Sequence, residues 1–270
     1  AGIVDLALEY GVADDFEVDQ GWQIGDLGDT ALHGWWGRCD PNGVYDGSVV
    51  VQPEDDATPD PGRICFVTGN GVPGAGEHQN DVDGGRTTLT SPHFDATWYW
   101  QPVVSFSWWY SNDTSYFVDD TLRVEISNDA GRTWVPLIVT TTSNHAWTQL
   151  SVAIEEVTTL SDSMRVRFIA ADTGEDSAVE VGVDDFAILG QAYAGLDDET
   201  PVPGETRFLG AQPNPFRPGG VLAFTLAREG RAQLEIYDPS GRCVRVLSTA
   251  APDAGPHRLA WDGADASGRL

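Results

Sequence analysis

Residues 103–110 read Val-Val-Ser-Phe-Ser-Trp-Trp-Tyr (VVSFSWWY), and this short stretch decides the fold class. Apolar side chains recur at every second position, with serines between them. Successive side chains of a β-strand point to opposite faces, so the stretch predicts a strand with one buried face and one solvated face. The buried face is expected to hold Val104, Phe106, Trp108 and Tyr110.

The same alternation returns further along the chain, in residues 121–127 (TLRVEIS) and 164–170 (MRVRFIA). The 30 glycines and 16 prolines are scattered at short intervals, and no stretch shows the period of an amphipathic helix. Antiparallel strands separated by Gly, Asp and Asn turns predict an all-β protein built as a β-sandwich, with a closed barrel as the weaker alternative.

The chain is strongly acidic, with 42 Asp and Glu residues, 15 arginines, no lysine and a formal net charge of −27. Such a surface repels phosphate backbones and anionic lipids, which argues against nucleic acid and anionic membranes as partners. No apolar run approaches the roughly 18 to 20 residues of a membrane helix, so membrane insertion is not expected. The first residues lack the pattern of a signal peptide, so export would need a signal upstream of Ala1.

A change in composition near residue 190 indicates two domains. Residues 1–190 hold 32 acidic residues and 7 arginines, whereas residues 191–270 hold 10 and 8. The segment 191–205 (QAYAGLDDETPVPGE) combines consecutive acids with two prolines, which is typical of a linker. The strand pattern resumes in 206–270, so we expect a second, smaller β-sandwich there.

Acidic residues cluster near the start of the first domain, in its glycine-rich loop and in its last strand. In that strand Val183 and Phe186 lie on opposite parities, so the register is expected to change at Asp184-Asp185 and turn a carboxylate inward. First and last strands of a sandwich commonly pair, and converging carboxylates repel one another unless a cation lies between them. Hard oxygen ligands without His or Cys nearby select Ca²⁺. The alternative is that these residues are solvated surface acids, and for Asp55 and Asp56 both interpretations stay open.

The first domain resembles the MAM-like jelly-roll module, also called the cleaved-adhesin type. The matching segments are DDFE (14–17) with Gly21-Trp22, CFVTG (65–69), NDVDGGRTTLTSP (80–92) and VGVDDFAI (181–188). The resemblance implies an exported accessory module of a bacterial adhesin or peptidase, such as a zinc carboxypeptidase, with a catalytic domain of the same parent protein upstream. It also implies a structural Ca²⁺ held by Glu17, Asp83 and Asp184, with Asp19, Asp81 and Asp185 as further candidates.

The second domain resembles the FlgD-type immunoglobulin-like module. The segments that carry this resemblance are QPNPFRPGG (212–220), LEIYDPSGRCVRVL (234–247) and GPHRLAWDG (255–263). In relatives a β-rich closing strand follows the last of these segments. The resemblance therefore implies an Ig-like sandwich that lacks its last strand within the present sequence.

Tryptophans offer a second kind of candidate site, because exposed aromatic rings can stack on sugars. Trp108 is expected in the core, whereas Trp98, Trp100 and Trp109 are the candidates for an exposed glycan platform. This interpretation remains open beside the structural one, in which a large jelly roll simply needs bulky core residues.

Two further motifs are interpreted as structural. SNDAGRTW (127–134) fits an Asp-box hairpin, in which Asp129 accepts backbone N–H groups and Trp134 packs beneath. Cys39 and Cys65 either form a disulfide, if their strands are neighbours, or remain free thiols, and Cys243 takes an apolar strand position.

The sequence contains no recognisable catalytic motif. Its five histidines are scattered without a zinc-binding pattern, and no nucleophile elbow or phosphate loop occurs. A carboxylate pair suited to glycoside hydrolysis remains an alternative. We therefore expect a non-catalytic, calcium-stabilised accessory or adhesion region of a secreted or surface bacterial protein, with a cell-surface glycan or protein as a possible partner. The rival interpretation is a carbohydrate-binding module.

Overall fold

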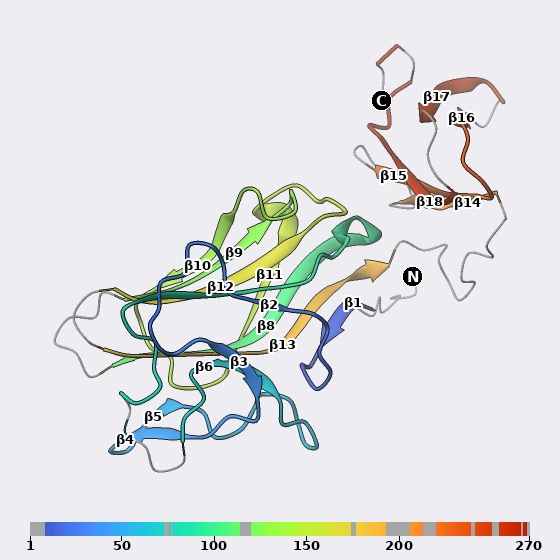
Figure 1. Cartoon of the computed structure of the whole chain (residues 1–270). Coiled ribbons are helices and arrows are strands. Elements are labelled where there is room, and N and C mark those ends of the chain that lie inside the picture. Colours follow the sequence, from blue (N-terminus) through green and yellow to red (C-terminus); the bar gives the residue numbers. More distant parts are fainter. Residues whose placement is uncertain are drawn as a thin grey trace, which may run out of the picture. The chain divides into compact units, whose positions relative to one another are not determined.

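In the computed structural model, the regular secondary structure of the described residues is almost entirely β-strand (Figure 1), as the alternation predicted. The structure describes residues 9–72, 76, 78–113, 120–173, 177–192, 206–212, 220–238, 241–249, 254–265 and 267–268. Two compact units separate after Gly190, one spanning Leu8–Gly190 and the other containing Gln191–Leu270. Most of the expected linker, residues 193–205, lies outside the described residues, while Gln191 and Ala192 still belong to a strand.

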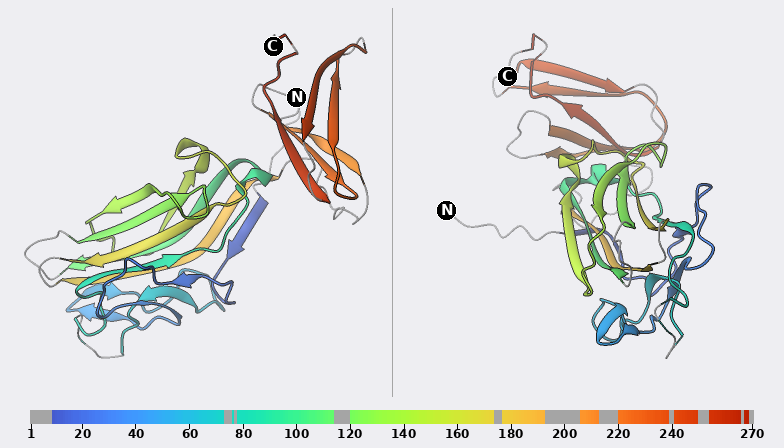
Figure 2. Two further views of the ribbon diagram at one scale, coloured as in Figure 1. Left: turned by 45° about the horizontal axis from the view of Figure 1, so that its top comes forward. Right: turned by 90° about the vertical axis from the view of Figure 1, so that its left-hand side faces the viewer.

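The first unit is a sandwich of two antiparallel sheets (Figure 2). One sheet has the order β11 (Thr148–Ala153), β8 (Tyr99–Asp113), β13 (Ala178–Ala192), β6 (Cys65–Thr68) and β3 (Trp36–Cys39), and β1 (Glu9–Asp14) also pairs with β13. The other sheet has the order β10 (Val135–Thr140), β9 (Thr121–Ser127), β12 (Arg165–Asp172), β7 (Gly85–Thr90) and β2 (Gln23–Ile24).

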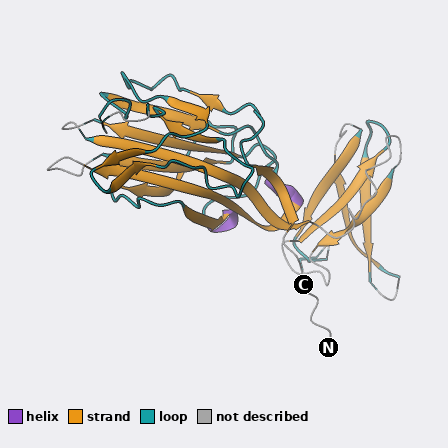
Figure 3. Ribbon diagram, turned by 90° about the horizontal axis from the view of Figure 1, so that it is seen from below, coloured by secondary structure: helices purple, strands orange, loops and turns teal. Residues whose placement is uncertain are grey.

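The core lies between these two sheets. The Phe106 ring of β8 meets the Phe168 ring of β12 edge to face, with centroids 4.9 Å apart. Val104 and Tyr110 are fully buried, as the pattern of 103–110 predicted, while Trp108 packs half-buried against the same core. Helical structure is limited, in the described part, to the short 3₁₀ turns η1 (Ala96–Trp98) and η2 (Ile154–Glu156) (Figure 3). Neither of these turns is long enough to cross a membrane.

The outer face of β8 is also covered, which corrects the expectation of a solvated face. A hairpin of β4 (Val44–Asp46) and β5 (Val49–Gln52) lies against the outer side of the β8–β13 sheet. Val44 and Val51 of the hairpin pack on Ala178 of β13, and Trp109 of β8 donates its Nε1–H to the Val51 carbonyl oxygen at 2.9 Å. The sheet is therefore buried on both sides where the hairpin crosses it.

Strand β13 changes register where the sequence predicted. Val183 and Phe186 both point into the core, although their parities differ, and Asp185 between them has a φ of 49°. Before this point β13 pairs with β6, and after it the strand pairs with β1, beginning with Phe186 opposite Asp14. The irregularity thus lets one strand serve two partners. The predicted inward carboxylate is wrong, because the register change turns Phe186 into the core and leaves Asp184 on the outer face, where it binds Ala57 and Thr58.

Two motifs of the first unit have the predicted structural character. In the Asp-box hairpin, Asp129 accepts hydrogen bonds from the N–H groups of Arg132 and Thr133 at 3.0 and 2.8 Å. Trp134 packs under the Arg167 guanidinium, 4.3 Å from ring centroid to carbon. Cys39 and Cys65 lie directly opposite each other on β3 and β6, yet both thiols are free.

The second unit contains two smaller sheets. One comprises β14 (Arg207–Gln212), β15 (Gly220–Leu226) and β18 (Gly255–Trp261), and the other comprises β16 (Ala232–Tyr237) and β17 (Cys243–Thr249). Phe224 and Leu226 of β15 pack with Ala232 of β16, so an apolar interior connects the sheets. Cys243 is exposed, and its predicted core position is wrong because the β16–β17 register shifts between Ile236 and Tyr237.

Candidate functional site

The candidate site of the first unit is an acidic hollow beside the loop 53–64, which follows the β4–β5 hairpin. The hollow has a volume of about 520 Å³. Its lining is almost entirely polar and includes Asp40, Asn42, Glu54, Asp55, Asp56, Thr58, Asp60 and Arg63. Three of the predicted ligands, Glu17, Asp184 and Asp185, bind this loop from β13 and from the segment after β1.

Asp184 anchors the loop from the outer face of β13. Its side chain is fully buried, and its Oδ2 accepts hydrogen bonds from the N–H groups of Ala57 at 2.7 Å and Thr58 at 3.1 Å. Its Oδ1 accepts the N–H of Asp185 at 2.8 Å. Burial raises the pKa of Asp184 to about 7, and the N–H donors oppose this rise only in part.

Asp185 and Glu17 hold the same loop at two further points. Asp185 Oδ1 accepts the hydroxyl hydrogen bond of Thr58 at 2.8 Å. Glu17 Oε1 accepts the N–H groups of Arg63 at 2.6 Å and Ile64 at 2.7 Å, and these donors lower the pKa of Glu17. The loop 53–64 contains no strand of its own. Hydrogen bonds to these carboxylates therefore hold it in place instead of strand pairing.

Asp56, unlike Asp184 and Glu17, has no hydrogen bonds from described residues that offset the cost of burying its carboxylate. Its Oδ2 is buried and accepts no hydrogen bond from any residue that the structure describes. Burial raises the pKa of Asp56 to about 6, and the charges of Glu17 and Asp185 add to the rise. An acid with a buried, unpaired oxygen beside other carboxylates favours either a proton or a bound cation. The sequence had left Asp56 undecided between this role and a solvated surface acid.

The structure does not bring all the predicted metal ligands together. Val82 donates its N–H to the carbonyl oxygen of Val179 at 3.0 Å, which places the loop of Asp81 and Asp83 near the start of β13. Asp184 lies five residues further along, roughly 16 Å away at the rise of an extended strand. A single ion held by Glu17, Asp83 and Asp184 together does not fit this geometry.

The remaining predicted ligands make local contacts. Asp81 is buried, 3.7 Å from His78 Nδ1, and its charge helps to raise the pKa of buried Glu180. The carbonyl of Asp83 accepts the N–H of Leu32 at 2.8 Å. Asp19 is exposed and accepts the N–H of Gly21 at 2.9 Å within its own turn.

Asp56 differs from the predicted ligands Glu17 and Asp184, because its buried Oδ2 accepts no hydrogen bond from a described residue. Among the described residues, no three or more His, Cys, Asp or Glu side chains already surround a common point. Both oxygens of Asp184 already accept backbone N–H groups, Oδ2 from the loop and Oδ1 from Asp185, so they do not demand a cation. The buried Oδ2 of Asp56, with Glu17 and Asp185 acting on its charge, supplies oxygen chemistry that suits Ca²⁺.

The predicted glycan platform is not formed by Trp109, which corrects that expectation. Trp109 is only 5% exposed, because the β4–β5 hairpin covers it and Trp147 packs edge to face on it with ring centroids 6.2 Å apart. The side chains of Trp98 and Trp100 lie outside the described part of the structure.

Trp35 is an exposed aromatic residue; the sequence offers Trp35-Trp36 as one of three aromatic runs for a sugar platform, but favours Trp98, Trp100 and Trp109 as the exposed members. Trp35 is 58% exposed, and its Nε1–H is held by the Ala31 carbonyl oxygen at 3.1 Å. The His33 ring lies 6.5 Å from it, centroid to centroid. The pair Trp35-Trp36 could have indicated this exposed position, because Trp36 is in the core and the residue before it faces the other way.

Comparison with known proteins finds a similarity to a known family in the second unit. Residues 219–270 match the family model described as the FlgD Ig-like domain. This segment covers most of the described strands of the second unit. No curated protein matches the chain.

Similar solved structures include adhesin and carbohydrate-binding modules. The K3 cleaved adhesin domain of Lys-gingipain from Porphyromonas gingivalis is 14% identical, with 68% of this chain and 99% of that chain covered and a TM-score of 0.36. The CBM22-1 xylan-binding domain of Paenibacillus barcinonensis Xyn10C is also 14% identical, with 69% and 98% covered and a TM-score of 0.37. Likenesses at this level do not identify a ligand for the present chain.

Proposed function

We propose that this chain is a non-catalytic accessory or adhesion region of a secreted or surface bacterial protein, whose first unit is stabilised by Ca²⁺. The observation that carries the proposal is the buried Oδ2 of Asp56, which lies unpaired among carboxylates that hold one loop to the sandwich. We further propose that the parent protein is a hydrolase such as a metallopeptidase, which is supported by the resemblance of the sequence motifs. The proposed non-catalytic character is supported by the lack of a recognisable catalytic motif in the sequence.

A cation at this place would reduce the repulsion between carboxylates that hydrogen bonds hold in fixed positions. Glu17 and Asp185 are fixed by their hydrogen bonds to the loop, so neither is free to move away from Asp56 without releasing that loop. A divalent ion bound at the Asp56 carboxylate would offset the repulsion that it feels from the charges of Glu17 and Asp185. A ligand that binds only the folded state stabilises it by mass action.

The test is thermal unfolding of the whole chain in Ca²⁺ and in chelator. At a Ca²⁺ concentration about 100 times Kd, binding contributes about 2.7 kcal/mol, which raises the Tm of the first unit by about 5–10 °C. Asp56→Asn is expected to remove this difference, whereas Glu155→Gln, at an exposed acid in η2, is expected to keep it. Equal Tm values in Ca²⁺ and chelator would contradict calcium stabilisation.

Carbohydrate binding is the second candidate function, and the exposure of Trp35 favours it. Its indole is fixed by its own N–H bond, so stacking on a sugar ring would cost little side-chain entropy. If Trp35 binds glycan, retention on a polysaccharide should fall about tenfold or more in Trp35→Ala and stay unchanged in Tyr45→Ala, another exposed aromatic residue. A spacer without glycan affinity predicts no saturable binding of the wild-type chain to any polysaccharide in the panel.

A further inference from the structure

Arginines gather along one strand, on the outer face of the β10–β9–β12–β7–β2 sheet of the first unit. Arg165 and Arg167 occupy successive outward positions of β12, because the alternate residues of this strand point into the core. Arg123 of β9 and Arg86 of β7 lie opposite the next two outward positions of β12. Four of the seven arginines of residues 1–190 therefore follow one strand, in a unit that is otherwise strongly acidic.

Acidic side chains balance three of these four arginines. Glu125 is only 5% exposed and accepts hydrogen bonds from Nη2 of Arg123 at 2.9 Å and from Nη2 of Arg167 at 2.6 Å. Nε of Arg86 lies 3.7 Å from Oδ1 of Asp29. The charges of these three guanidinium groups are thus met within the protein.

Arg165 is the member of the group that no acid balances. Its Nε–H donates to the carbonyl oxygen of Ser91 at 2.9 Å, and its guanidinium forms no ion pair with a carboxylate that the structure describes. Burial lowers the pKa of Arg165, and no neighbouring charge contributes to the shift. The guanidinium therefore loses part of its hydration without gaining a charged partner, which favours an anion from outside the chain.

The Asp-box hairpin places an indole and another arginine beside Arg165. A side-chain carbon on Gly131 would lie 3.2 Å from Cζ2 of Trp134 and 3.9 Å from Nη1 of Arg165, so these two side chains are neighbours. Trp134 is half-buried, and the Arg167 guanidinium lies 4.3 Å from its ring centroid. Arg132, next to Gly131 in the chain, is exposed and forms no ion pair with a described residue. Two unbalanced cations thus flank one indole.

The negative charge of the unit limits which anions can bind here. The acidic loop 53–64 lies against the outer face of the other sheet, and the sheets are about 10 Å apart. This separation exceeds the Debye length of about 8 Å at physiological ionic strength. Asp129, the acid of the hairpin, already accepts four hydrogen bonds within it. A single carboxylate therefore meets a locally cationic surface, whereas a long polyanion meets the repulsion of the whole unit.

The surroundings favour a sugar acid over the carboxylate of a peptide. Strand β12 pairs with β9 and β7 along both of its edges, so a peptide strand cannot be added beside Arg165. A guanidinium fork matches the plane of a carboxylate, and an indole offers an apolar surface to a pyranose ring. A uronic acid residue presents both features, because its ring carries the carboxylate directly.

We propose that Arg165, Arg132 and Trp134 form a binding site for a uronic acid residue of a glycan. The Arg165 guanidinium binds the sugar carboxylate, Arg132 adds a second cation, and Trp134 contacts the ring. The choice of a glycan rests on the proposed adhesive role, whereas the site itself lies apart from Trp35 and from Asp56.

The test is isothermal titration calorimetry of the whole chain with trigalacturonate, with galactotriose as the neutral control sugar. We expect saturable binding of trigalacturonate that is about tenfold or more tighter than that of galactotriose, because only the acid forms charge-assisted hydrogen bonds. The titration is repeated in chelator and with Trp35→Ala, and neither change is expected to alter the affinity.

Variants separate the contribution of charge from that of the indole. Arg165→Gln should weaken trigalacturonate binding about tenfold or more and leave galactotriose unaffected, while Arg228→Gln, at an exposed arginine of the second unit, changes neither. Arg132→Gln, at an exposed position, should weaken trigalacturonate about threefold at an unchanged Tm.

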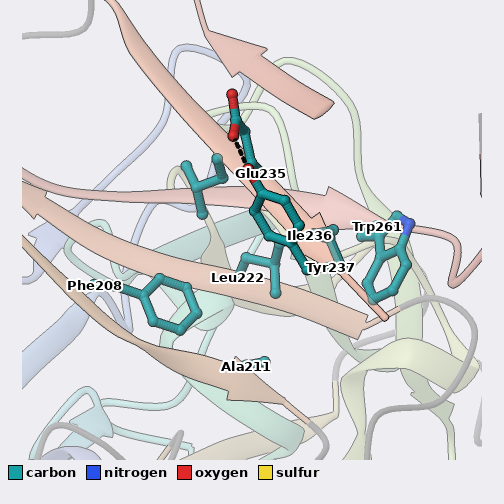
Figure 4. A pocket seen from close by; sticks show the side chains of 8 residues that line it. Phe208, Ala211, Leu222, Glu235, Ile236, Tyr237 and Trp261 are labelled. Atoms are coloured by element: carbon teal, nitrogen blue, oxygen red, sulfur yellow. Dashed lines mark hydrogen bonds between the residues drawn. The ribbon is translucent and has the colours of Figure 1, made fainter. Parts of the chain in front are cut away.

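The contact with the indole is tested in the same way. Trp134→Ala should weaken both sugars. Its matched control is Tyr237→Ala, because Tyr237 is 55% exposed and lines an apolar groove of the second unit, far along the chain from the arginines (Figure 4).

Three results would overturn the proposal. Galactotriose could bind as tightly as trigalacturonate, or Arg165→Gln and Arg132→Gln could both bind trigalacturonate as the wild type does. A triglutamate peptide could compete as strongly as trigalacturonate, which would make the site one for acidic peptides. Failure of calcium stabilisation would appear as equal Tm values in Ca²⁺ and chelator and would leave this titration unchanged, so the two proposals fail separately.

Discussion

At the residue scale, two acids that hold the same loop have opposite pKa shifts. Asp184 is buried in the sheet, and burial raises its pKa to about 7, whereas hydrogen bonds from Arg63 and Ile64 lower the pKa of Glu17. The difference follows from position: the chain irregularity at 184–185 forces one carboxyl beneath the loop, while the other reaches the loop from outside.

These shifts predict that the first unit becomes more stable as the pH falls from 8 toward 5. With pKa values of about 7 and 6, Asp184 and Asp56 hold protons in the folded state that the unfolded state releases above about pH 4. Stability from this source is therefore lost as the pH rises through 6 to 7.

The measurement is urea unfolding between pH 5 and 8 in chelator, for wild type, Asp184→Asn and Glu155→Gln. Asp184→Asn should flatten the slope, and Glu155→Gln should leave it as in the wild type. A wild-type stability that rises with pH over this range would refute the assignment of these protons.

At the element scale, β8 is packed on both of its faces. Its inner face forms the core with Val104, Phe106 and Tyr110, and its outer face carries Trp109 beneath the β4–β5 hairpin. The hairpin is thus a third layer, fixed by contacts with the sheet.

Trp109→Ala should therefore destabilise the first unit by about 3–5 kcal/mol, because it leaves a cavity and removes the bond to the Val51 carbonyl. Trp35→Ala is the matched control and should change stability by less than about 0.5 kcal/mol, since that side chain is exposed. Urea unfolding measures both. If Trp109→Ala left the free energy of unfolding unchanged, Trp109 would not be covered by the hairpin and would again be a candidate for contact with a ligand.

At the scale of the whole molecule, the two units differ in charge and in core size. The sandwich of residues 8–190 combines a large aromatic core with nearly all of the net negative charge, whereas the second unit is almost neutral and has a small core with an open groove. Charge of one sign keeps a module soluble and selects cations as partners. The two units therefore present surfaces of different charge, strongly anionic in the first and almost neutral in the second.

The sequence by itself determined several strands, their core-facing side chains and the register change at Asp184-Asp185, because a period of two reports directly which side chains of one strand share a face. It also indicated a hairpin at the Asp box, whose hydrogen bonds are local. Only the tertiary structure decided which acids meet: Asp184 binds Ala57, 127 residues away, whereas Asp83 lies at the other end of the same strand. It also decided that Trp109 is covered, since a strand's own pattern contains no information about a third layer laid over the sheet by a distant hairpin. Local periodicity fixes faces, but contacts between distant segments depend on pairing register and on loop paths, which no single strand encodes.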